Sequence, residues 1–145
     1  MEELLLFLNS IHSLNKETRN FLTSKLKSIE VAKRDFILKE GEICREIYFI
    51  NTGLLRCFYI KHNKQINSWF MREGDVIVSV ESFFQQTQSK ENIQALEDCL
   101  LYYINYDELQ FAYENFPDFN SIGRILTEKY YQLSEQRLYL SLIHI

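Results

Sequence analysis

The residues of this chain that could carry out chemistry are few, and they do not form a catalytic set. Ser79, Glu81 and Ser82 bring two hydroxyls and a carboxylate close together. A serine nucleophile also needs a base that accepts its proton, usually a histidine, and neither His12 nor His62 stands near these residues in the sequence. The sequence therefore predicts no catalytic residues and no enzymatic activity.

Metal and cofactor binding are not indicated either. The three cysteines, Cys44, Cys57 and Cys99, are far apart, and no pair of them forms a C-x-x-C motif. His12 and His62 have no second ligand at a metal-binding spacing. We predict three reduced thiols, no metal site and no cofactor.

Composition and charge exclude two classes of partner. The 145 residues include 16 basic and 20 acidic side chains, and the net charge is −4. Nucleic-acid binding depends on a positive field, which this chain lacks. No apolar run approaches the ~20 residues of a membrane span, and acidic Glu2 and Glu3 stand where a signal peptide carries basic residues. A cytoplasmic chain with no membrane partner is expected.

Three glycines indicate the turns between the elements that must position any site. Gly41, Gly53 and Gly74 each adjoin runs rich in Ile, Phe, Tyr and Val. Glycine adopts positive φ without steric cost, so this pattern predicts short antiparallel strands and a double-sheet roll. The expected strands are Ile29–Ala32, Asp35–Leu38, Glu46–Asn51, Leu54–Lys61, Gln65–Met71, Asp75–Val80, Asn92–Glu97 and Leu100–Asn105.

Helical periodicity occupies both ends of the chain. Apolar residues recur at helical spacing within residues 1–28, where Asn15 or Ser13 could cap a helix. The same spacing returns from Tyr106, and this helix should stop before Pro117. A longer helix is then expected to begin at Pro117, since proline is favoured in the first turn.

The order of these turns resembles that of a known family. Leu38–Glu42 ends in Glu-Gly-Glu, Tyr48–Ile50 runs into the turn at Gly53, and Glu73–Asp75 contains a Gly-Asp corner. Over about residues 10–139, the chain resembles the cyclic-nucleotide-binding-type β-roll of the Crp/Fnr family of bacterial transcriptional regulators. The resemblance implies a mainly β fold with flanking helices, a double-stranded β-helix jelly roll, and a long C-terminal dimerisation helix.

The resemblance also implies a position for a ligand site. Members that bind cAMP carry a Gly-Glu pair for the ribose and an Arg-Ser pair whose arginine neutralises the phosphate. Val78-Ser79 and Ser89-Lys90 occupy these positions here, so both anchoring side chains are missing. We therefore expect no cAMP binding in the usual mode. The candidate ligand-binding residues are Ser79, Glu81, Ser82, Ser89 and Lys90.

The long helix suggests assembly. In the family it pairs with its copy in a second subunit and leads into a helix-turn-helix domain. Its apolar residues here recur every three or four positions, at Phe119, Ile122, Leu126, Tyr130 and Leu133. The stripe predicts a homodimer, although a helix packed on its own roll would show the same stripe. The expected division is a sensor domain of N-terminal helices and β-roll over residues 1–116 and a dimerisation or linker helix over residues 117–139.

The last six residues have an unusual sequence. Leu140–Ile145 is the translation of CTG TCT CTT ATA CAC ATC, the end sequence of a transposon-based sequencing adapter. We therefore expect residues 140–145 to be a non-native tail. The natural protein would then continue beyond Tyr139 into a DNA-binding domain, through which alone it would bind DNA.

Together these features predict the effector-sensing and dimerisation part of a Crp/Fnr-type transcriptional regulator whose small-molecule effector is unknown. The alternative is a stand-alone β-roll, either a small-molecule-binding module or a cupin-like protein. A cupin enzyme needs two or three histidines and a carboxylate around a metal, and a closely spaced histidine pair is absent from the sequence. This absence disfavours the cupin enzyme and leaves the binding module open.

Overall fold

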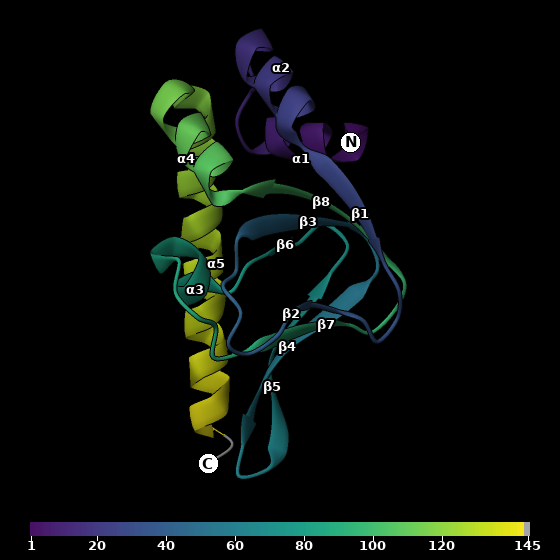
Figure 1. Ribbon diagram of the computed structural model, residues 1–145. Coiled ribbons are helices and arrows are strands. Elements are labelled where there is room, and N and C mark those ends of the chain that lie inside the picture. Colours follow the sequence, from purple (N-terminus) through teal and green to yellow (C-terminus); the bar gives the residue numbers. More distant parts are fainter. Residues whose placement is uncertain (144–145) are drawn as a thin grey trace.

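Two four-stranded antiparallel sheets form the centre of the molecule (Figure 1). The computed structural model describes residues 1–143, and the side chains of residues 1–138. The first sheet has the order β1 (Lys27–Val31), β8 (Cys99–Asn105), β3 (Glu46–Thr52), β6 (Val76–Ile77). The second has the order β2 (Phe36–Leu38), β7 (Asn92–Ala95), β4 (Leu54–Lys61), β5 (Lys64–Arg72). The predicted double-sheet roll is confirmed.

Helices cover one end and one side of this roll. The helices are α1 (Glu2–Ile11), α2 (Lys16–Lys25), α3 (Val80–Gln85), α4 (Tyr106–Asn115) and α5 (Pro117–Ile143). Figure 1 shows α1, α2 and α4 gathered at one end of the roll and α5 running along its side. Residues 140–143 of the predicted tail continue α5, while His144 and Ile145 lie outside the described residues.

Side chains from both sheets form the core between them. Ile50 of β3, Leu55 of β4, Ile93 of β7 and Leu101 of β8 are completely or almost completely buried. The predicted hairpin turns also occur. The β4–β5 turn places His62 and Asn63 at positive φ, the conformation that a two-residue hairpin loop requires.

Two expected strands are too long. The strand predicted over Asp75–Val80 ends at Ile77, and Val80 begins helix α3. The β-branched and aromatic residues of this segment favour a strand by propensity, but burial of Phe83 and the hydrogen bonds of Ser82 hold it as a helix. The strand predicted over Asn92–Glu97 ends at Ala95.

A hydrogen-bond network fixes the start of α5 to α2. Asn15 caps α2 by accepting a bond from the Thr18 N–H at 2.9 Å, as predicted. The Asp118 carboxylate accepts bonds from the Thr18 hydroxyl at 2.6 Å and from the Asn15 N–H at 2.9 Å. Burial alone would raise the pKa of Asp118, but these bonds outweigh it and lower the pKa below its ordinary value. The first turn of α5 is thereby anchored at the end of the roll.

The β3–β4 turn packs closely around Gly53. Its φ is +114°, and an added Cβ would overlap the Cys99 thiol and approach the Asp98 carbonyl oxygen to 2.9 Å. We expect Gly53→Ala to lower the free energy of unfolding by about 2–3 kcal/mol, measured by urea denaturation. Gly41 has φ +91° with open space around it, so Gly41→Ala should cost only about 1–2 kcal/mol of backbone strain. Equal losses in both variants would contradict the clash.

Candidate functional site

A pocket of about 480 Å³ lies between the roll and helix α5. Strands β3 to β6 and helix α3 form one wall, and Tyr113 of α4 and the middle of α5 form the other. The wall is mainly apolar, with Ile47, Met71, Val76 and Val78 on the roll and Leu126 on the helix. Its volume and lining are those of a small-molecule site.

Trp69 of β5 joins the roll to the distal half of α5. The Arg137 guanidinium lies 4.0 Å from the centre of the Trp69 ring, and the Tyr130 ring lies 6.5 Å away at a tilted angle. The Tyr130 hydroxyl also accepts a hydrogen bond from the Val76 N–H at 2.9 Å. Burial raises the pKa of Tyr130 and lowers that of Arg137. These contacts close the side of the pocket, and a cation over tryptophan is worth about 0.5–2 kcal/mol.

Cys57 and Glu91 supply a thiol and a carboxylate to the same pocket. Burial and the neighbouring Glu91 carboxylate raise the pKa of Cys57 to about 12. The thiol is therefore protonated at neutral pH and is a poor nucleophile. Glu91 directly precedes β7 and is only partly buried. It is the acidic residue among those that line the pocket.

The hydroxyls of the three predicted serines form hydrogen bonds within the chain. Ser79, Ser82 and Ser89 are all buried. The Ser79 and Ser89 hydroxyls lie 3.3 Å apart, and Ser89 also donates to the Glu91 carbonyl at 2.8 Å. The Ser82 hydroxyl accepts from the Cys44 N–H at 2.8 Å. These hydroxyls hold the segment between β6 and β7 in place beside the pocket.

The two charged candidates, Glu81 and Lys90, are exposed and do not line the pocket. Glu91 and Arg137 do line the pocket, but the sequence analysis did not identify them. A signal for Glu91 existed, because it directly follows the Ser89-Lys90 positions. No sequence signal pointed to Arg137, which reaches the pocket only through the packing of α5.

The sequence of this chain matches that of a known family. Residues 28–116, more than half of the chain, match the sequence profile of the cyclic nucleotide-binding domain. The chain belongs to the cyclic nucleotide-binding domain family. No protein with curated function matches it in sequence.

Three solved structures share the fold of this chain. A cyclic nucleotide-binding domain from Methylobacillus flagellatus superimposes with a TM-score of 0.80 at 18% identity, covering 97% of this chain and 83% of that one. The catabolite activator protein of Thermus thermophilus gives a TM-score of 0.72 at 17% identity and 95% coverage of this chain. The sensor domain of the transcriptional regulator DNR from Pseudomonas aeruginosa gives 0.70 at 14% identity, covering 94% of this chain and 91% of that one. This chain spans 63% of the length of the T. thermophilus protein.

Within this family fold, most of the predicted dimer stripe is covered by the chain itself. Phe119 and Ile122 are buried, with 7% and 1% of their surfaces exposed, and Leu126 and Tyr130 line the pocket. Leu133 is half-buried and lies outside the pocket lining. Packing of α5 on the rest of its own chain therefore accounts for four of the five residues, and the dimer remains a prediction.

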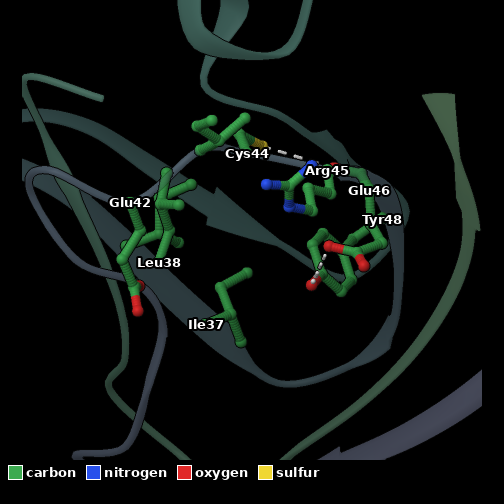
Figure 2. Close-up of a pocket in the computed structure, with 9 residues that line it drawn as sticks. Ile37, Leu38, Glu42, Cys44, Arg45, Glu46 and Tyr48 are labelled. Atoms are coloured by element: carbon green, nitrogen blue, oxygen red, sulfur yellow. Dashed lines mark hydrogen bonds between the residues drawn. The ribbon is translucent and has the colours of Figure 1, made fainter. Parts of the chain in front are cut away.

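A second pocket of about 270 Å³ lies beside the segment that enters β3. Figure 2 shows Leu38 and Glu42 on one side of it and Glu46 and Tyr48 on the other. The Tyr48 hydroxyl lies 3.5 Å from the Glu46 carboxylate, and the Cys44 thiol donates to the Glu46 carbonyl. Burial and the nearby Glu46 carboxylate raise the pKa of Tyr48. Tyr48 and Cys44 therefore both contact Glu46 within the wall of this smaller pocket, which makes it the weaker candidate site.

The described residues form neither a metal site nor a membrane-spanning helix. Among them, no three His, Cys, Asp or Glu side chains converge as metal ligands would. No described helix has the length and apolar character needed to cross a membrane.

Proposed function

We propose that this chain is the effector-sensing and dimerisation part of a Crp/Fnr-type transcriptional regulator and has no catalytic activity. The fold that it shares with a catabolite activator protein and with the sensor domain of another transcriptional regulator supports the proposal. In this proposal, DNA is bound only through a further domain that is not part of this sequence.

One observation carries the proposal: the pocket has one wall on the roll and the other on α5. A small molecule that fills it would contact Val78 on the roll and Leu126 on the helix together. It would shift α5 to the extent that it binds one helix position better than another. The distal half of α5 contacts the roll around Trp69, so this half is the part that a ligand would move.

We also propose that the effector is not cAMP bound in the usual mode. The Ser79 and Ser89 hydroxyls face each other at 3.3 Å where the resemblance places the glutamate and the arginine, and Val78 fills the position of the glycine that permits a close backbone approach. A hydrogen bond to a charged group is worth about 1.5–3 kcal/mol, so loss of the arginine alone would weaken cyclic phosphate binding by roughly 10- to 150-fold.

Hydrogen exchange after substitution of Trp69 tests the coupling of pocket and helix. Trp69→Ala removes the contacts to Arg137 and Tyr130. We expect amides within residues 124–138 of α5 to exchange at least about tenfold faster, whereas those of α4 should keep their protection. Phe70→Ala, on the neighbouring exposed side chain, is the control. Unchanged exchange in α5 of Trp69→Ala would mean that the helix is held independently of the pocket, which would contradict the sensing proposal.

A further inference from the structure

The pocket contains two formally charged side chains, Glu91 and Arg137. Among the described residues neither has an ion-pair partner, and the ion pair that α5 does form, Arg124 with Glu128, lies on its solvent-exposed surface. A charge that faces a mainly apolar pocket is stabilised by an opposite charge, which a ligand can supply. The chemistry of the ligand therefore depends on which of the two charges dominates.

Glu91 lies at the end of the pocket that is formed by the segment between β6 and β7. Its backbone N–H donates to the Ser89 hydroxyl at 3.0 Å, and Ser89 stands where members that bind cAMP carry the phosphate-binding arginine. The segment between β6 and β7 therefore presents a carboxylate to the pocket. Its one cation, Lys90, is exposed and lies outside the pocket lining. Compared with a phosphate site, the sign of the charge at this end is inverted.

Arg137 lies toward another part of the pocket and is more exposed. It stacks on Trp69 of β5, whereas Glu91 borders β7, and β4 lies between these two strands. Strands lie about 4.8 Å apart, so β5 and β7 are separated by roughly 10 Å. Solvent screens the exposed guanidinium more strongly than the partly buried carboxylate. Glu91 therefore sets the sign of charge that the pocket interior favours.

We propose that the pocket binds a small organic cation, a protonated amine carried on an apolar or aromatic body, with the amine against Glu91. This inference rests on the proposed sensing function and names the ligand class of the same pocket. The apolar body would pack among Ile47, Val78 and Leu126. The Tyr130 ring also lines the pocket, and an aromatic ring attracts cations and stacks on planar rings.

Three indoles that differ only in their end group test the sign of the charge. Tryptamine is a cation, tryptophol is neutral and indole-3-acetate is an anion at pH 7. We expect isothermal titration of the full chain to show tryptamine binding at least about tenfold more tightly than indole-3-acetate, with tryptophol between them. In Glu91→Gln the three should bind within about threefold of one another. Glu114→Gln, on the exposed surface of α4, should keep the preference of the wild type.

The outcomes separate this inference from the proposed function. Tighter binding of indole-3-acetate or of cAMP than of tryptamine would overturn the cation assignment and leave a ligand-binding sensor. Equal binding of tryptophol and tryptamine would do the same. If none of the three binds, the pocket loses its role as a ligand site, and the cation assignment and the sensing proposal both fail. Binding of the three indoles to the wild-type chain distinguishes these outcomes even if Glu91→Gln does not fold.

Discussion

Phe83→Ala is expected to lower the free energy of unfolding by about 3–5 kcal/mol, the range for truncation of a buried aromatic residue. Phe83 is fully buried, and its ring packs edge-on against Tyr106 at 5.5 Å. The cavity left by the substitution cannot easily collapse, because Ser82 and Gln86 bond to the backbone of Cys44 on either side of it. Urea denaturation followed by circular dichroism measures the loss.

The neighbouring residue Phe84 provides the matched control. It leaves 47% of its surface exposed at the edge of the pocket, so Phe84→Ala should cost less than about 1 kcal/mol. Similar losses in the two variants would show that α3 is not anchored in the core through Phe83. The segment between β6 and β7 would then lack the fixed position that the pocket requires.

Where local chemistry fixes an element, the sequence predicted it. Strand β4 spans Leu54–Lys61 as expected, because Gly53 and the His62 turn bound it on both sides. Proline at position 117 separates α4 from α5 as expected. Helix α3 was missed because its residues have strand propensity. Its conformation depends on contacts with Cys44 that form only when distant segments meet.

Of the predicted ligand-binding residues, Ser79 and Ser89 are buried beside the pocket and Lys90 is exposed, whereas its neighbour Glu91 lines the pocket, and their role in binding stays a prediction. The chain bends at Lys90 and Glu91, where the Ser89 hydroxyl bonds to the Glu91 backbone, and this bend leaves Lys90 exposed while Glu91 lines the pocket. Trp69 and Arg137 are far apart in sequence, and only the direction in which α5 packs brings them to 4.0 Å. A stripe of apolar residues also cannot show whether it faces a second subunit or its own chain, and here Phe119 and Ile122 are buried within their own chain, Phe119 against Tyr113 of α4.

Leu133→Glu is expected to convert a symmetric dimer into a monomer. Phe119 and Ile122 are committed to the core of their own chain, so a seam between two copies of α5 must use its distal half. Leu133 lies there, is half-buried and does not line the pocket. Burying an unpaired carboxylate costs several kcal/mol, so the dimer dissociation constant should rise by at least about a hundredfold, measured by sedimentation velocity.

The control for this prediction is Leu138→Glu. Leu138 is 61% exposed and lies five positions further along, about 140° around the helix from Leu133. If the seam runs along Leu133, a charge at Leu138 faces solvent and should leave the dimer intact. Dissociation by Leu138→Glu alone would place the seam on the opposite surface of α5. A wild-type chain that stays monomeric at high micromolar concentration would show that α5 packs only on its own chain. The dimerisation part of the proposal would then fail. The pocket and its ligand could still be tested in the monomer.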